Sequence, residues 1–149
     1  MIYNRTATDV SLAKRLRAEK VQKFIELTDD EVQTLERGTI TINTLNRIEN
    51  KQAEIKTMLD DMGYLNTPVI NKTWTLNDIF TADDLQRIVD NNTALRAAFY
   101  ALSDSPKNAI AKYYYEEFNA LEKILFDISC NIEYAVSKYR RCGTFNCGG

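Results

Sequence analysis

LNRIENKQAEIKTMLDDM, residues 45–62, shares its pattern of apolar and polar positions with LQRIVDNNTALRAAFYAL, residues 85–102, which lies forty residues later. In both stretches apolar side chains recur every three or four residues, and one polar residue interrupts each series at the same point, Gln52 or Asn92. This spacing places a stripe of side chains along one face of an α-helix. The repeat therefore predicts two related helices that bury the same kind of seam. The matched apolar positions are Leu45, Ile48, Ile55, Leu59 and Met62 in the first stretch and Leu85, Ile88, Leu95, Phe99 and Leu102 in the second.

Gln52 and Asn92 are the polar interruptions of the two seams, and two arrangements are open for them. A buried amide without a partner costs about 1–3 kcal/mol. If the two helices pack antiparallel, both amides could lie in one layer and bond to each other, which would fix the helix register at some cost in stability. The alternative is that both amides point to the rim of the core.

Composition favours one all-helical domain. A chain of 149 residues suits a single domain, and 44% apolar with 27% charged residues is typical of globular proteins. It has only five Gly and two Pro, and three of the Gly lie in the last seven residues. Such sparse turn signals favour long helices over many short strands. We predict an all-α bundle of about four helices over residues 1–141 and a short Gly-rich tail over residues 142–149, either flexible or ordered by a partner.

Capping residues predict where the first two helices begin and end. Thr8 or Asp9 is the expected cap of a first helix that runs to about Glu26. Thr28 and Glu31 form a capping box for a short second helix. Gly38 is its expected left-handed stop. The expected inward residues are Leu12, Leu16, Val21, Phe24 and Ile25 in the first helix and Val32 and Leu35 in the second.

The later helices follow the repeat. The first repeat helix is expected over residues 43–62 with Gly63 as its stop, and the second runs from the Thr81–Asp84 capping box to about Leu102. A last helix is expected over residues 106–141, with Ser105 as its cap. Its expected inward residues are Phe118, Leu121, Leu125, Ile128, Ile132, Ala135 and Tyr139.

Residues 64–80 form the longest irregular stretch. Pro68 and the alternating Val69 and Ile70 indicate an extended loop that packs across the helices. Trp74 is the only tryptophan, and its large ring suits an anchor for this loop better than a ligand platform.

The residue inventory argues against catalysis and metal binding. Histidine is absent, which removes the commonest acid–base group near neutral pH and the commonest metal ligand. Adjacent acidic residues such as Asp83 and Asp84 point about 100° apart on a helix and do not form a catalytic pair. Cys142 and Cys147 have no further zinc ligands near them in the sequence, which argues against a zinc site. A disulfide between these two cysteines remains an alternative. Cys130 lies in the middle of the last expected helix and fits a buried position. We expect no enzyme, no cofactor and no metal site.

Contact with other proteins is the expected activity. Three consecutive rings at Tyr113, Tyr114 and Tyr115 cannot all be buried on one helix, and exposed tyrosine is a common interface composition. Trp74 and the tail residues Cys142, Phe145 and Cys147 complete the interface candidates. The first 26 residues carry three more basic than acidic side chains, which suits a solvated face or an acidic neighbouring subunit.

Charge and hydropathy limit the other partners and the location. The net charge of −2 argues against a general nucleic-acid binder. No apolar run approaches the ~20 residues that span a bilayer, and the N-terminus lacks the apolar stretch of a secretory signal. We therefore expect a protein that is made in a cytoplasm and has no membrane span.

Four segments in this order resemble a known family. They are MIYNRTATDV (1–10), LTDDEVQTLERGTITINTLNRIENKQAEI (27–55), KTWTLNDIFTADDLQRIVDN (72–91) and YRRCGTFNCGG (139–149). Together they are similar to small proteins encoded in the tail-gene regions of phages and prophages of Firmicutes-type bacteria. The resemblance covers almost the whole chain and supplies no catalytic residue.

The resemblance implies a structural part of the virion tail, at the baseplate or the fibre end. Its partners would be other tail proteins and copies of itself. Two other functions remain open. One is a cytoplasmic assembly chaperone or adaptor that acts during tail construction. The other is a nucleic-acid-binding regulator that uses the basic first helix.

Overall fold

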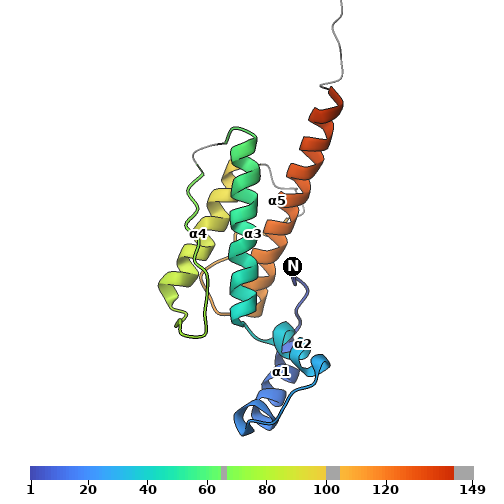
Figure 1. Cartoon of the computed structure of the whole chain (residues 1–149), viewed down its shortest axis with the longest axis vertical. Coiled ribbons are helices and arrows are strands. Elements are labelled where there is room, and N and C mark those ends of the chain that lie inside the picture. Colours follow the sequence, from blue (N-terminus) through green and yellow to red (C-terminus); the bar gives the residue numbers. More distant parts are fainter. Residues whose placement is uncertain (65–66, 100–104, 143–149) are drawn as a thin grey trace, which may run out of the picture.

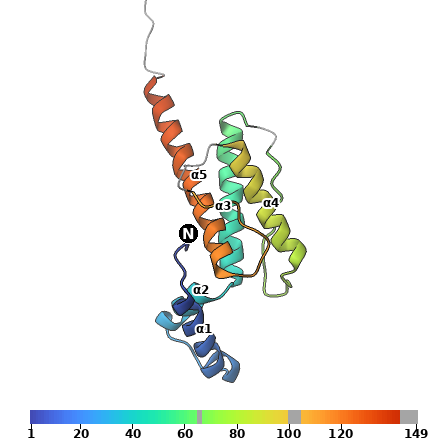
Figure 2. The ribbon, with the colours of Figure 1, turned by 180° about the vertical axis from the view of Figure 1, so that it is seen from behind.

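The computed structural model describes residues 1–64, 67–99 and 105–142, with side chains described through residue 138. In these ranges all regular elements are helical, which confirms the all-α class with five α-helices rather than about four. Helices α3, α4 and α5 form a bundle, and α1 and α2 form a hairpin at one end of it (Figure 1; Figure 2 shows the back). The elements are α1 (Ala7–Glu19), the 3₁₀ turn η1 (Val21–Lys23), α2 (Asp29–Gly38), α3 (Ile42–Asp61), α4 (Ala82–Ala98) and α5 (Tyr115–Cys142).

The three bundle helices run in the same direction (Figures 1 and 2). The antiparallel arrangement considered for the two repeats is therefore not the one found. Parallel neighbours need long return connections, and the stretches between α3 and α4 and between α4 and α5 supply them. Because the two repeat helices are parallel and in register, equivalent residues of the repeat lie at the same height in the bundle.

This register brings Gln52 and Asn92, the polar residues within the two apolar seams, into hydrogen-bonding contact. The Gln52 side-chain NH₂ donates to Asn92 Oδ1 at 3.0 Å and to the Ile88 carbonyl oxygen at 2.9 Å. Asn91 donates to Gln52 Oε1 at 3.1 Å, and Asn92 donates to the Leu121 carbonyl oxygen of α5 at 3.1 Å. The core position of the amides is thus confirmed and the rim alternative is wrong. Since each buried amide finds partners, this layer ties α3, α4 and α5 together without the cost of an unpaired polar group.

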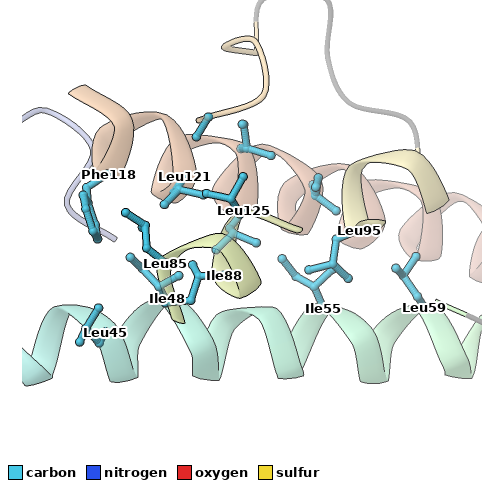
Figure 3. Packing of buried hydrophobic residues seen from close by; sticks show 14 of the residues in the cluster. Leu45, Ile48, Ile55, Leu59, Leu85, Ile88, Leu95, Phe118, Leu121 and Leu125 are labelled. Atoms are coloured by element: carbon cyan, nitrogen blue, oxygen red, sulfur yellow. The ribbon is translucent and has the colours of Figure 1, made fainter. Parts of the chain in front are cut away.

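The apolar seams of α3, α4 and α5 face one another in the core (Figure 3). The repeat residues Leu45, Ile48, Ile55 and Leu59 of α3 and Leu85, Ile88 and Leu95 of α4 are all buried, while Met62 and Phe99 pack partly buried against them. Phe118, Leu121, Leu125, Ile128 and Ile132 complete the core from α5, and Ala135 is half-buried. Leu102 and the side chain of Tyr139 lie outside the described residues.

The residues that cap α2, α3 and α4 agree with the capping signals in the sequence. The Thr28–Glu31 and Thr81–Asp84 capping boxes are confirmed, and Thr41 caps α3 at the position equivalent to Thr81. Gly63 adopts φ +92° after α3, which confirms its role as a left-handed stop. Helix α4 ends at Ala98, before the expected Leu102, because Phe99 is extended.

Helix α1 is shifted and shorter than expected. Its cap is Thr6, not Thr8 or Asp9, because Asp9 occupies the third helical position and completes the capping box with Thr6. The helix ends at Glu19 instead of about Glu26, since the chain turns through η1. Several expected inward residues are exposed, from 38% for Val21 to 98% for Phe24; the others are Leu12, Ile25 and Val32.

Gly38 has a different role from the expected one. It is the last residue of α2 and is buried, and Gly63 is the glycine with positive φ in the described ranges. A Cβ atom at residue 38 would overlap the carbonyl oxygen of Asp9 and the Cβ of Ala13. Gly38 therefore permits the close approach of α2 to α1, and it is not a left-handed stop.

The turn after α1 holds a non-glycine residue in the left-handed region. Phe24 has φ 55° and ψ 34°, the Ile25 N–H donates to the Lys20 carbonyl oxygen at 3.0 Å, and the Phe24 N–H donates to that of Val21 at 3.2 Å. This is the Schellman pattern, in which glycine normally occupies the position of Phe24. The ring of Phe24 is 98% exposed, so it makes almost no contact that would offset the backbone strain.

We expect Phe24→Gly to raise the free energy of unfolding by about 1 kcal/mol, because glycine adopts this conformation without steric cost. Chemical denaturation monitored by circular dichroism measures the change. Phe24→Ala is the control, since it removes the ring but keeps a Cβ and should give no gain. Equal stability of the two variants would contradict the strain.

The last helix starts nine residues later than expected, at Tyr115 instead of residue 106. In residues 105–114, which precede this helix, polar groups bond to side chains of α5 instead of forming helical hydrogen bonds. The Ser105 hydroxyl donates to Asp127 Oδ2 at 2.6 Å and caps no helix, while the Ile110 N–H donates to Glu117 Oε2 at 2.9 Å. These bonds hold residues 105–114 along α5 as irregular chain.

A buried carboxylate joins the N-terminal segment to the bundle. Glu122 of α5 is fully buried, and its Oε1 accepts bonds from Arg47 at 2.8 and 3.1 Å and lies 3.4 Å from Nη2 of Arg5. Its Oε2 accepts from the Ile2 N–H. Asn119 also bonds to the backbone of Arg5. The chain before α1 is thereby fastened to α5.

The repeat extends to a second ion pair of the same kind. Arg87, the residue equivalent to Arg47, donates to both carboxylate oxygens of buried Glu49 at 2.7 and 2.9 Å. Each repeat helix thus carries one arginine that pairs with a buried glutamate on a neighbouring helix: Arg47 of α3 with Glu122 of α5, and Arg87 of α4 with Glu49 of α3. These hydrogen bonds to Glu49 raise the pKa of Arg87.

Candidate interaction surface

Trp74 fastens the irregular stretch to α3. Its backbone exchanges two bonds with the Asn46 side chain, at 2.7 and 3.0 Å, and its indole N–H donates to Glu49 Oε1 at 2.8 Å. The side chain is only 3% exposed. The role of loop anchor fits these contacts, whereas a residue so deeply buried offers almost no surface to a partner. Asn91 holds the same stretch to α4 by bonding both backbone groups of Ile70.

A chain of aromatic rings leads from this anchor to the tyrosines. The ring of Trp74 lies 5.3 Å from that of Phe80, and the ring of Phe80 lies 5.6 Å from that of Tyr113, both edge to face. Phe80 thereby connects two interface candidates that are far apart in the sequence. Its role is not visible in the helical periodicity, because Phe80 lies in the irregular stretch just before Thr81, the cap of α4.

Five exposed apolar side chains belong to the two segments that the Phe80–Tyr113 contact brings together. Leu76 is 92% exposed and Ile79 82%, while Tyr113 and Tyr114 are 52% and 62% exposed and Ile110 49%. We call this set the aromatic end surface. The expected exposure of at least one tyrosine is confirmed, although Tyr113 and Tyr114 precede α5 and only half-buried Tyr115 belongs to it. Phe145, Cys147 and the side chain of Cys142 lie outside the described residues.

The loop that carries Leu76 and Ile79 is held in place by a carboxylate. Asp78 Oδ2 accepts from both the backbone N–H and the hydroxyl of Thr75 at 2.7 Å, and Lys72 Nζ lies 2.8 Å from Asp78 Oδ1. These bonds, that of Lys72 first, lower the pKa of Asp78 to about 2. The exposed apolar residues are thus presented on an ordered turn.

The lowered pKa of Asp78 gives a pH prediction. An unfolded aspartate titrates near 3.9, so the ionised form favours the folded turn above that pH, and this contribution is lost as the pH falls through about 2. We expect an NMR titration of the Asp78 carboxyl carbon to give a midpoint of about 2. Lys72→Met should move the midpoint toward the ordinary value. A wild-type midpoint near 3.9 would contradict the bonding scheme.

A hollow of about 200 Å³ lies between the base of the hairpin and the start of α5. All three consecutive tyrosines contribute to its wall, and Phe118 closes it toward the core. The hollow is therefore continuous with the aromatic end surface. Its remaining lining comes from Arg5, Val10, Gly38, Thr39 and Ile40.

The buried ionisable groups of the described residues hold the structure together. Glu49 and Glu122 bind arginines, and Asp127 binds Lys123 and Ser105. Among residues 1–64, 67–99 and 105–142, no three potential metal-binding side chains of His, Cys, Asp or Glu form a group. No described helix has the length and apolarity to cross a membrane. No protein-family model, curated protein or solved structure matches this chain at a significant level.

Proposed function

We propose that this protein is a non-enzymatic structural component of a phage tail or tail-like particle, associated with the baseplate or fibre. It is made in the cytoplasm of the bacterial host and retained in the virion. It acts by packing its exposed apolar surface against neighbouring tail proteins and further copies of itself. The resemblance of the four sequence segments supports the tail assignment, and the aromatic end surface supports the mode of action.

The observation that carries the packing role is the exposure of Leu76 and Ile79, each more than 80% exposed on a turn fixed by Asp78. Apolar side chains gathered at one place on a surface mark interaction sites. Because this turn is ordered before any partner arrives, association loses little conformational entropy there. The adjoining Tyr113 and Tyr114 add rings of the type enriched in interfaces.

Mass spectrometry of purified particles tests the tail assignment. We expect the protein in stoichiometric amount in particles that have passed a density gradient. An assembly chaperone would be present in the extract of the producing cells and absent from the finished particles. Absence from the particles would therefore overturn the structural role and favour the chaperone.

Substitution of the aromatic end surface tests the mode of action. Leu76→Ser with Ile79→Ser should reduce the number of copies per particle at least about tenfold, because two apolar contacts are worth more than 1.4 kcal/mol. The control is Tyr134→Ser on α5, where the ring is similarly exposed at 63% but lies on another element. Both variants should retain the wild-type circular dichroism spectrum. Normal incorporation of the double variant would contradict the role of this surface.

A further inference from the structure

The hairpin of α1 and α2, residues 7–38, packs within itself and hardly against the bundle, from one end of which it extends (Figures 1 and 2). Among the described residues, α1 and α2 contact each other closely but make almost no backbone contact with α3, α4 or α5. The buried residues of the hairpin are Ala13 and Gly38, and these two face each other. The hairpin therefore buries no large side chain against the bundle. Relative motion is the usual behaviour of two units whose interface is not large and apolar.

The junction between the hairpin and the bundle is loosely filled. The hollow of about 200 Å³ is lined by hairpin residues such as Val10 and Gly38 and, from the chain before α5, by Tyr114. A close-packed junction leaves few voids larger than a water molecule. In the described part of the chain, one side-chain hydrogen bond crosses from α3 to the hairpin, from Asn43 to Glu36 at 2.7 Å, and it is exposed. Water can replace such a bond at little cost.

Bonds at both ends of the hairpin hold it together as one body. Next to the bundle, Arg37 Nε lies 3.4 Å from Asp9 Oδ1, and next to the turn Lys20 Nζ lies 2.7 Å from Glu31 Oε1. A capping box also closes the N-terminus of each of its two helices. Because α1 has 13 residues, the turn that carries Phe24 lies about 20 Å from the bundle end of the hairpin.

Two threonines connect the hairpin to parts of the chain that are fixed. Thr6, with φ −120° and ψ 163°, follows Arg5, whose backbone exchanges bonds with the Asn119 side chain of α5 at 2.9 and 3.2 Å. Thr39, with φ −132° and ψ 156°, precedes Ile40, which packs against the core. Both threonines are extended residues at the ends of helices, the positions where hinges commonly lie. Since Arg5 and Thr39 line the same hollow, the two connections lie near each other.

We propose that the hairpin is a hinged arm, which keeps its internal structure and changes its angle to the bundle by rotation at Thr6 and Thr39. The hollow supplies the space for this motion. The turn with Phe24, which is 98% exposed, moves farthest, while the aromatic end surface stays with the bundle. One copy of the protein can thus present these two exposed apolar regions at different relative angles. The inference goes beyond the proposed function and does not depend on the presence of the protein in particles.

Residual dipolar couplings of the isotope-labelled chain in a dilute liquid-crystalline medium test the hinge. They report N–H orientations averaged over the microsecond-to-millisecond range in which hinge motions occur. The couplings of α1 and α2 should together fit one alignment tensor, whose magnitude is smaller than that of the tensor fitted to α3, α4 and α5. One shared tensor of full magnitude would overturn the hinge. Hairpin couplings that fit no common tensor would also overturn it, because the arm would then melt instead of rotating.

Loosening one connection tests where the hinge lies. Asn119→Ala removes the side chain that holds the Arg5 backbone to α5, so the arm should lose further alignment while the bundle keeps its own. Asn50→Ala, at an exposed asparagine of α3, is the control and should leave both tensors as in the wild type. If Asn119→Ala loses its helical spectrum, two glycines inserted after Thr39 loosen the other connection instead. An arm whose alignment is unchanged by loosening would overturn the inference.

Discussion

Replacing Glu122 with glutamine should lower the free energy of unfolding by about 3–5 kcal/mol, the usual cost of removing one partner of a buried ion pair. Glu122 is fully buried; its carboxylate forms ion pairs with Arg5 and Arg47 and accepts a hydrogen bond from the Ile2 N–H. Arg5 is itself only 5% exposed, and burial lowers the pKa of its guanidinium despite the neighbouring carboxylate. Without the carboxylate, this cation would remain in the core without a counter-charge. Urea denaturation measures the loss.

Two further variants separate this effect from general damage to α5. Glu133→Gln changes an exposed carboxylate on the same helix and should stay within about 0.5 kcal/mol of the wild type. Glu122→Leu combined with Arg5→Met should recover much of the lost stability, because an apolar pair avoids the unpaired charge. Arg47 is 25% exposed and can turn its charge toward water. A Glu122→Gln variant as stable as the wild type would contradict the buried cluster.

The second large effect is expected from Gly38→Ala. The new Cβ would overlap the Asp9 carbonyl oxygen and the Ala13 Cβ, so α1 and α2 must move apart. Overpacking of this kind costs about 1–3 kcal/mol. Because the hairpin lies at one end of the bundle, the damage should remain local (Figures 1 and 2).

Hydrogen exchange read by mass spectrometry shows where the Gly38→Ala damage lies. Amides of α1 and α2 should exchange faster, while those of α3, α4 and α5 should keep their wild-type protection. Adding Ala13→Gly should not restore the hairpin, because the clash with the backbone of Asp9 remains. Unchanged exchange in the hairpin would contradict the close approach at Gly38.

The local signals in the sequence predicted much of the bundle. The three- and four-residue spacing identified the buried faces of α3, α4 and most of α5 because helix periodicity is a property of the chain itself. The Thr28 and Thr81 caps were visible for the same reason, since a capping box spans only four residues. The matching of Gln52 with Asn92 left a shared layer open as one of two arrangements, and only for antiparallel helices, whereas the structure forms the layer between parallel ones.

The features that were missed depend on contacts between distant residues. The parallel direction of the bundle helices is set by the return path of the long connections, and Trp74 fixes one of these paths by bonding to Asn46 and Glu49. The role of Gly38 depends on Asp9 and Ala13 of another helix. Residues 105–114, expected to be helical from residue 106, instead make contacts with distant residues, such as the bond of Ser105 to Asp127.

The interaction surface was predicted only in part. Three consecutive tyrosines indicated exposed rings whatever the fold, and Tyr113 and Tyr114 are exposed. Leu76 and Ile79 gave no such signal, since an isolated apolar residue in a loop can equally well pack inward. The arginines at positions 47 and 87 were visible as part of the repeat, but their buried glutamate partners are set by the arrangement of the helices.

The account depends most on the two related helices meeting in register to form the rigid body that carries the exposed surface. A double-mutant cycle with Gln52→Ala and Asn92→Ala, read by urea denaturation, tests this contact directly. The account predicts a coupling free energy of about 1 kcal/mol between the two substitutions, because the direct bond between the two amides is lost in either single variant. Strictly additive losses would contradict it.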